Sequence, residues 1–405
     1  MVAVASVSAR PAVFWLAGLA VFAVATSARI ALATRKIADG QYRRARVVAS
    51  AVGPLGVVTL FVVAFLVPPS GPPTRPAPVA GQSFWQLPTG SRIAYVHLPA
   101  HGAPRPTPVV FLHGGPGIAD MAGDAAYFGQ LAEDGFDVYV YDQAGTGRSS
   151  RLADPRQYTI SRGVADLEAI RRQIGADRVM LVGHSWGAQV AASYLATHGE
   201  HVARAVFSSP GALAPALDDG SDTGVRSRLT AGQQLRLYNS LLLWPRGLLA
   251  YTLLQVNPAA AHAFAGDAEM DAQLDRVYNH SRPGLHCRTP PAGPALHGLG
   301  FYAHQYPQSA TSRPWADPRP QLARQATPAV VIKGACDYLS WSSAHAYRQA
   351  LPGAELVYLH RAGHNAYQDQ PCAFLATVRA FLTGQPLPIK PWTQPQAPAD
   401  YEGPR

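Results

Sequence analysis

Val179-Met180-Leu181-Val182-Gly183-His184-Ser185-Trp186-Gly187 is the stretch that decides the fold of this 405-residue chain. Its apolar start predicts a buried strand, and the Ala-rich residues 186–197 predict a helix directly behind it. A turn this tight needs small residues around Ser185, and it pushes the serine hydroxyl out at the carboxyl end of the sheet. The positive end of the helix dipole then faces that oxygen. The stretch therefore predicts a nucleophilic serine on an α/β sheet.

Short runs of Val, Ile and Leu recur before and after this stretch and alternate with helical patterns. Such runs are typical of parallel strands that are buried on both faces. We expect a mostly parallel sheet with helices on both faces. The predicted strands are 92–97, 108–113, 137–142, 178–184, 203–208, 329–334 and 355–360, and the predicted helices between or after them include 164–174, 186–197 and 372–382.

The alternation stops between residues 211 and 324, where helical segments at 231–244 and 259–277 occur without a clear strand. We interpret this stretch as a helical cap inserted over the sheet. The predicted organisation is a membrane anchor (1–67), a Pro-rich linker (68–83), a core in two pieces (84–210 and 325–385), the cap (211–324) and a Pro-rich tail (386–405).

A serine hydroxyl needs a base, and the base needs a third group that orients it. Asp337 and His364 each follow a predicted strand, at the edge where Ser185 lies, and their order along the chain fits a serine, acid, histidine arrangement. We predict Asp337 as the acid and His364 as the base. Asp317 is the alternative acid, although no strand precedes it.

His113-Gly114-Gly115-Pro116-Gly117 follows the predicted strand 108–113. Glycines let the backbone approach a bound carbonyl and present N–H groups to it. The backbone N–H of Trp186, the residue after the nucleophile, is expected to complete this oxyanion hole. Gly114 and Gly115 both remain candidates for the other donor, with Gly115 preferred.

Together with Asp142-Gln143-Ala144-Gly145-Thr146-Gly147-Arg148-Ser149, these motifs resemble the α/β-hydrolase superfamily, and within it the proline iminopeptidase-like serine aminopeptidases. The resemblance extends over about residues 90–382. It implies a Ser-His-Asp triad, no metal or cofactor, and hydrolysis of an N-terminal residue, often proline, from short peptides. For residues 142–149 we expect a bracing role near the site and not a catalytic one.

Three features depart from the iminopeptidases. Residues 208–210 read Ser-Ser-Pro in place of an arginine-glycine pair, and Gly183-His184-Ser185 replaces the frequent Gly-Gly-Ser. The cap, where iminopeptidases bind the substrate's amino group with carboxylates, has one glutamate, Glu269, and a few aspartates.

We expect an aminopeptidase acting on short peptides or amino-acyl amides. The alternatives are a carboxylesterase or lipase-type hydrolase of small esters, and a catalytically silent scaffold used as a binding module. Apart from Asp317, the acidic residues of the cap are Asp218, Asp219, Asp222, Asp267, Glu269, Asp271 and Asp275.

Composition narrows the classes further. With 48% hydrophobic and 15% charged residues, the chain has too many apolar residues for a disordered protein or a coiled coil. The net charge of +9 does not indicate nucleic-acid binding, because most basic residues are scattered singly. Their one dense cluster, within residues 35–46, lies between two apolar runs.

These runs, about 11–34 and 47–67, predict two transmembrane helices, since a bilayer core needs roughly 20 apolar residues. The basic loop between them should stay in the cytoplasm, which leaves both chain ends and the hydrolase domain outside. A signal peptide cleaved near residues 26–28 is the alternative interpretation. Oligomeric state is left open by the sequence.

Cysteine is scarce, with three residues and no C-x-x-C pair. If the domain is extracytoplasmic, Cys336 and Cys372 are candidates to form a disulfide, which would leave Cys287 free in the cap. The spacing alone does not decide the pairing.

Overall fold

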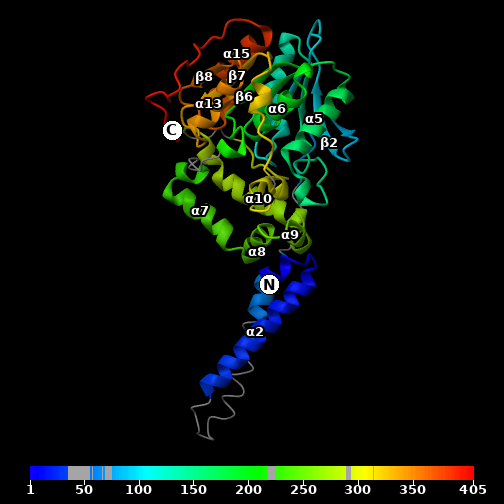
Figure 1. Cartoon of the computed structure of the whole chain (residues 1–405), viewed down its shortest axis with the longest axis vertical. Coiled ribbons are helices and arrows are strands. Elements are labelled where there is room, and N and C mark those ends of the chain that lie inside the picture. Colours follow the sequence, from blue (N-terminus) through cyan, green and yellow to red (C-terminus); the bar gives the residue numbers. More distant parts are fainter. Residues whose placement is uncertain are drawn as a thin grey trace.

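In the computed structural model, the described residues are 1–34, 55–56, 58–65, 67–68, 75–217, 224–288, 293–312 and 314–405. Figure 1 shows three tiers along the long axis of the molecule. The sheet and its helices form one end, the helices of the cap lie next to them, and the apolar helix α2 projects from the cap on the side opposite the sheet.

Eight strands form one mixed sheet in the order β1-β2-β4-β3-β5-β6-β7-β8. The pairs β1–β2 and β2–β4 are antiparallel and all other pairs are parallel, which confirms the mostly parallel sheet. The strand β1 was not predicted. The strands are β1 Gln82–Gln86, β2 Arg92–Leu98, β3 Val109–Leu112, β4 Val138–Tyr141, β5 Val179–His184, β6 Val202–Ser208, β7 Ala329–Gly334 and β8 Glu355–Leu359.

Helices cover both faces of the sheet, as predicted. One face packs against α5 (Ile160–Ile174), α6 (Trp186–Thr197) and α13 (Trp341–Ala350), whose apolar side chains share a core with the strands. The other face packs against α4 (Met121–Phe128) and α15 (Pro371–Thr383). Burial on both sides explains why the central strands consist of continuous apolar runs.

The regular secondary structure of the insertion between β6 and β7 is helical, with no strand among its described residues. The predicted helix 259–277 is two helices, because the backbone at Ala265 is extended and Gly266 starts a new helix. The helices of this cap are α7 Ala231–Leu242, α8 Pro245–Leu254, α9 Pro258–Phe264, α10 Asp267–Ser281 and α11 Phe301–Gln305, and the short helices α12 Arg319–Leu322 and α14 Ala366–Asp369 lie closer to the core.

Within the described ranges, one helix has the length and composition to cross a bilayer. This is α2 (Pro11–Thr34), through its segment Pro11–Ile30. Its 24 residues extend about 36 Å, enough for a hydrocarbon core of about 30 Å. Residues 55–56 and 58–65 of the second predicted span are helical, but the rest of its N-terminal part and the basic loop lie outside the described residues. The prediction of two spans is therefore not confirmed.

The N-terminal segment packs against the cap. The rings of Phe14 and Trp15 lie 6.4 and 5.3 Å from the ring of Phe264 in α9, and both side chains are buried. The amide of Asn257 donates to the carbonyl of Ala5 in the short helix α1 (Val2–Ala5) at 2.8 Å. These contacts bury apolar surface that the cap would otherwise expose.

The C-terminal residues after α15 return to the core. The Tyr401 side chain is buried, and its hydroxyl donates to the carbonyl of Leu339 at 2.8 Å. Backbone hydrogen bonds join Glu402 to Ala335 and Trp341 to Pro404, each at 2.8 Å. The end of the chain thus lies against the loop that follows β7.

Candidate active site

The turn between β5 and α6 has the geometry that the sequence predicts. Ser185 has φ 53° and ψ −115°, a conformation rarely adopted by a residue with a side chain. The turn requires glycine on both sides, because a Cβ at Gly183 would lie 2.6 Å from the Gly187 oxygen, and one at Gly187 would lie 2.1 Å from the Leu112 oxygen. A hydrogen bond holds the Ser185 backbone in place: its N–H donates to the backbone carbonyl of Ser208 at 2.9 Å.

The predicted acid and base form a hydrogen bond. Asp337 lies three residues beyond the end of β7, and its Oδ1 is 2.8 Å from Nδ1 of His364. Asp337 is fully buried, and the same oxygen accepts the Leu339 N–H at 3.1 Å. His364 lies five residues beyond the end of β8 and lines the same cavity as Ser185. The three predicted residues therefore come together at one edge of the sheet.

A buried lysine beside the acid was not predicted. Lys333, inside β7 and fully buried, donates from Nζ to Oδ2 of Asp337 at 2.9 Å and to the Leu339 carbonyl at 2.9 Å. Burial alone would raise the pKa of Asp337, but the charges of Lys333 and His364 outweigh it and hold that pKa well below its ordinary value. Asp337 is thus kept ionised. A lysine in an otherwise apolar strand is the signal in the sequence that points to such a pair.

The loop that carries His364 is tied to the end of the cap. The carboxylate of Asp369 accepts the backbone N–H of Gly363 at 2.7 Å and that of Cys287 at 2.9 Å. Its other oxygen contacts Nδ1 of the buried His286 at 2.7 Å. This network fixes the backbone next to His364 and is a second feature that the sequence did not reveal.

His184 lies between Gly183 and Ser185 in the turn, and its ring centroid is 4.9 Å from that of His364. Burial, followed by the neighbouring His364, lowers the pKa of His184 to about 3. His184 is therefore neutral near pH 7, and it packs against His364 without adding a like charge. The ring also contacts Tyr367 at 5.5 Å between centroids.

The glycine loop after β3 borders the nucleophile. A Cβ at Gly114 would lie 2.9 Å from Cβ of Ser185, so the two backbones are in close contact. Gly114 and Gly115 line the cavity, and Trp186 begins α6 with an N–H that no residue of its own helix accepts. In the described part of the chain, neither glycine donates its N–H to another backbone group. All three predicted donors remain available to a bound oxygen.

Two neighbours brace this loop. Burial lowers the pKa of His113 to about 4, so its neutral Nε2 accepts the Gln143 N–H at 2.9 Å. Thr146 donates its hydroxyl to the Gly117 carbonyl at 2.9 Å. Asp142 closes its own turn by accepting the Arg148 N–H at 2.8 Å. The bracing role expected for residues 142–149 agrees with these contacts.

Other candidates are engaged elsewhere. Asp317, the alternative acid, pairs with Arg319 and lines no part of the cavity that contains Ser185. The acidic residues of helix α10 are also turned to structural partners. Asp267 contacts His262, Glu269 pairs with Arg246, Asp271 pairs with Arg151, and Asp275 accepts the backbone N–H groups of Gly298 and Leu299.

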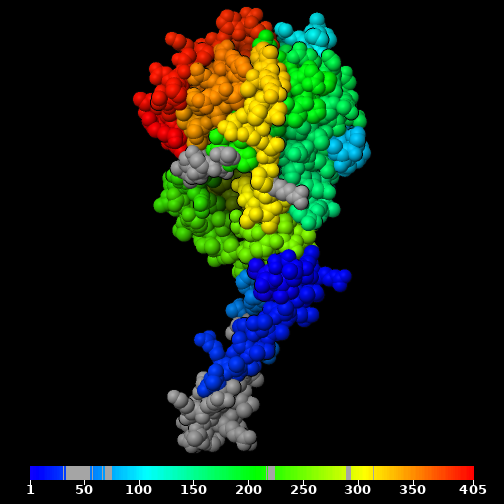
Figure 2. Space-filling view, viewed as in Figure 1, coloured from blue at the N-terminus to red at the C-terminus, as the bar shows by residue number. Residues whose placement is uncertain are grey.

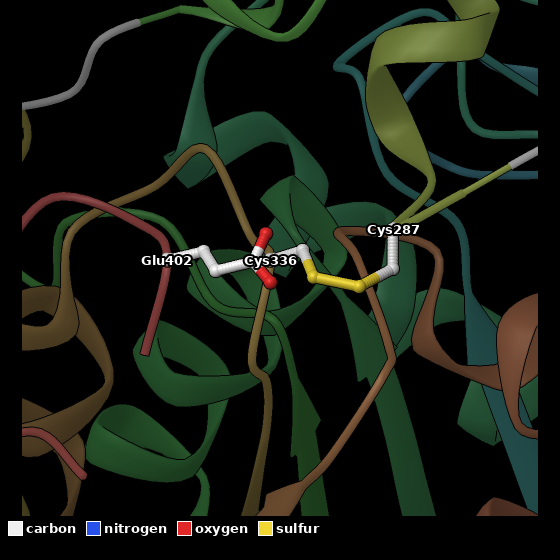
Figure 3. A group of neighbouring side chains, drawn as sticks. All are labelled: Cys287, Cys336 and Glu402. Atoms are coloured by element: carbon white, nitrogen blue, oxygen red, sulfur yellow. A yellow bond between two sulfur atoms is a disulfide. The ribbon is translucent and has the colours of Figure 1, made fainter. Parts of the chain in front are cut away.

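The disulfide prediction is wrong. Cys287 and Cys336 form the bond, with their Cα atoms 5.1 Å apart, and Cys372 is free and exposed (Figure 3). Cys287 reaches Cys336 because the Asp369 network brings the end of the cap onto the core, a contact that spacing along the chain does not reveal. Glu402 lies beside the two sulfurs, but both sulfurs are bonded to each other and not free to bind a metal.

The cavity at Ser185 has a volume of about 710 Å³. The end that contains Ser185 and His364 also contains Asp120 and Asp124, which are the acidic residues among those that line it. The Tyr367 hydroxyl donates to Asp124 at 3.0 Å, and burial, together with the charge of Asp120, raises the Asp124 pKa well above its usual value. The rest of the wall comes mostly from apolar side chains of the cap, including Leu237, Leu241, Leu242, Leu248, Tyr251, Met270, Leu274, Val277, Leu285 and Phe301.

Comparisons with known proteins agree with this arrangement. A family model described as alpha/beta hydrolase fold matches residues 107–256. The chain is 39% identical over 129 residues to the proline iminopeptidase of Heyndrickxia coagulans, a match that covers 31% of this chain and 42% of that protein. It is 28% identical over 278 residues to the proline iminopeptidase of Levilactobacillus brevis, covering 68% of this chain and 88% of that protein.

Solved structures support the same fold. The proline iminopeptidase of Mycobacterium smegmatis superposes with a TM-score of 0.51 at 21% identity, over 75% of this chain and 98% of that chain. The structure of VinJ superposes with a TM-score of 0.52 at 19% identity, over 76% of this chain and 100% of that chain. From the fold and these similarities, we conclude that the chain has the α/β-hydrolase fold and is similar to the proline iminopeptidases.

Proposed function

We propose that this hydrolase is a serine enzyme that works through Ser185, His364 and Asp337. The observation that carries the proposal is the 2.8 Å contact between Asp337 and His364 at the cavity that also contains the strained Ser185. Asp337, kept ionised by Lys333, fixes the imidazole with its Nε2 free to act as a base.

In the proposed reaction, Nε2 of His364 takes the proton of the Ser185 hydroxyl as the oxygen attacks the substrate carbonyl. The oxyanion accepts the N–H of Trp186 and that of Gly115 or Gly114, and each such donor contributes about 3 kcal/mol to the transition state. His364 then gives its proton to the leaving group as the bond to it breaks. Water, activated by the same imidazole, hydrolyses the acyl-enzyme and restores the serine.

For the substrate, we propose the free amino end of a short peptide or amino-acyl amide. Two observations favour an aminopeptidase: the similarity to proline iminopeptidases, and the carboxylates of Asp120 and Asp124 at the Ser185 end of the cavity. In this proposal, these two residues take the place of the acidic residues of α10, which have structural partners. Asp218, Asp219 and Asp222 lie outside the described residues. The mostly apolar wall favours the second candidate, a carboxylesterase, which needs no amine.

The test compares wild type with Ser185→Ala on an amino-acyl p-nitroanilide, its N-acetylated form and a p-nitrophenyl ester. We expect Ser185→Ala to lower kcat by about 10⁴-fold or more and to abolish labelling by a fluorophosphonate probe. Unchanged turnover would refute the assignment, and a wild type that neither turns over nor is labelled would favour a silent scaffold. An aminopeptidase does not cleave the N-acetylated p-nitroanilide. In an aminopeptidase, Asp120→Asn also raises the KM for the substrate with a free amino group and leaves the KM for the ester unchanged. An esterase shows neither effect.

We also propose that residues 1–67 anchor the enzyme in a membrane as two helices, with the hydrolase domain outside the cytoplasm. Support comes from the exposed apolar length of α2, the basic residues at 35–46 and the disulfide, since disulfides persist in oxidising compartments. The burial of Phe14 and Trp15 against the cap favours a retained segment over a cleaved signal peptide.

A further inference from the structure

Exposed apolar residues of the cap helices α7 and α8 form part of the cavity wall. Leu241, Leu242, Leu248 and Tyr251 line the cavity and are also 36%, 61%, 50% and 43% exposed. The same side chains therefore belong to the inner wall and to the outer surface, and we call these four residues the cavity mouth. Large apolar residues this exposed, and grouped on two neighbouring helices, mark a surface that meets another apolar phase.

The cavity mouth lies beside the N-terminal segment. Arg246, at the start of α8, donates to the carbonyl of Phe65 at 3.0 Å, and the ring of Phe61 packs against Trp15 of α2. Figure 1 shows that α8 and the end of α7 next to it are among the cap elements nearest to α2. In Figure 2 the cap rests directly on the N-terminal segment, with the core on its far side.

If α2 spans a bilayer, its contacts with the cap indicate where the bilayer surface would lie. Beyond Trp15, its described side chains are exposed or half-buried, and Leu16 (67%), Val21 (70%) and Val24 (71%) are among the exposed ones. A helix that is apolar around its whole circumference is stable only in a lipid environment or a protein core. Because Phe14 and Trp15 touch the cap within the first turn and a half, the surface of such a bilayer would lie at the underside of the cap, next to α8.

The lining of the cavity changes character along its length. The stretch from Leu237 to Tyr251 contributes no charged side chain to the wall, although Arg226 and Arg282 line it from other elements. The opposite end holds the polar groups of Ser185, His364 and Asp120. A peptide bound in the apolar part would have backbone N–H and C=O groups without hydrogen-bond partners, whereas a hydrocarbon chain has no polar groups that need partners. A polar head with a hydrocarbon tail fits both ends.

We propose that the substrate is a membrane amphiphile that enters from the bilayer through the cavity mouth. Its hydrocarbon chain lies in the cavity between α7, α8 and α10, and its scissile ester or amide carbonyl reaches Ser185. This proposal rests on the proposed serine hydrolase activity and on the proposed anchor. At that same site it favours the second candidate, an esterase, over hydrolysis of short peptides.

The test uses the full-length protein in phosphatidylcholine vesicles with p-nitrophenyl butanoate and p-nitrophenyl dodecanoate. Each buried methylene favours binding, so we expect kcat/KM for dodecanoate to exceed that for butanoate by about tenfold or more. The double variant Leu242→Asp/Leu248→Asp places charge at the cavity mouth. It should lower the dodecanoate-to-butanoate ratio about tenfold, because the charges oppose entry of the longer hydrocarbon chain more than entry of the shorter one.

Leu235→Asp is the matched control, because Leu235 is 62% exposed on α7 but does not line the cavity. It adds one negative charge, against two in the double variant, two turns before Leu242, and the ratio should stay at the wild-type value. A wild-type ratio at or below one, or a ratio that the double variant and the control change equally, would overturn the proposal while leaving the hydrolase activity intact. Failure to hydrolyse either ester, with turnover of the amino-acyl p-nitroanilide retained, would overturn this inference and leave the serine hydrolase activity standing. Failure on all three substrates would overturn both proposals.

Discussion

At the scale of single residues, the pair of Lys333 and Asp337 links stability to the candidate site. Both side chains are fully buried, and their charges lie 2.9 Å apart with no exposure to solvent. Removing one member of a buried pair leaves an uncompensated charge, whereas replacing both is far less costly. Comparing variants that remove one or both charges therefore measures what the pair contributes to stability, separately from the role of Asp337 in catalysis.

We expect Lys333→Met to lower the free energy of unfolding by about 3–5 kcal/mol near neutral pH, because it strands the Asp337 carboxylate. Lys333→Met/Asp337→Asn should lose less than this single variant, since no charge is left buried and asparagine still accepts the Leu339 N–H. Urea unfolding of the two variants and the wild type measures both. A double variant less stable than the single one would contradict the account.

The same pair sets a pH dependence. The pKa of Asp337 is held below its unfolded value of about 3.9, so the stability that it contributes is present above that pH and is lost as the pH falls below it. In Lys333→Met, burial dominates and the pKa rises. Over the range from about pH 7 to 5, the variant should therefore gain stability on acidification while the wild type does not gain it from this group. Unfolding curves at several pH values distinguish the two slopes.

At the scale of elements, the central strands and the site at their ends could be predicted because the physics that forms them is local. Continuous apolar runs mark strands buried on both faces, and the tight turn at Ser185 demands small neighbours. β1 was missed because Gln82–Gln86 has only two apolar residues and pairs on one side only. Lys333 pairs with Asp337 only four residues away, so a signal was present in the sequence, as the single lysine of an apolar strand. The Asp369 network was missed because Asp369 and Cys287 are 82 residues apart in the chain.

The disulfide joins two such distant elements, the end of the cap and the loop of Asp337. Its 49-residue separation predicts that Cys287→Ser/Cys336→Ser lowers the free energy of unfolding by about 2–4 kcal/mol. Denaturant unfolding under non-reducing conditions measures the loss. Cys372→Ser is the control, because this cysteine is free and exposed, and it should leave stability within about 0.5 kcal/mol of wild type. Equal effects of the two variants would argue against the pairing.

At the scale of the whole molecule, the contact between α2 and the cap predicts that the mature protein keeps its N-terminus. Cleavage near Ala28 would remove Phe14 and Trp15 and expose the apolar cluster around Phe264. Intact-mass measurement of the protein purified from membranes should therefore give the full 43.1 kDa. A product that begins near residue 29 would instead show that the first apolar run is a signal peptide.

Orientation is tested separately. If the basic loop at 35–46 lies in the cytoplasm, alkaline phosphatase joined through a flexible spacer to Arg405 should be active, since this reporter folds only outside. The same reporter inserted within residues 35–46 should be inactive. The reverse pattern would place the hydrolase domain in the cytoplasm, where the Cys287–Cys336 bond would not persist.

The return of the chain end to the loop after β7 has a consequence for biosynthesis. Tyr401 and Glu402, which pack on the loop of Asp337, follow every strand of the sheet along the chain and so leave the ribosome after them. A polypeptide that stops before residue 401 would contain the whole sheet yet lack the cover over its acid. Translation must therefore pass residue 402 before the loop of Asp337 is fully packed.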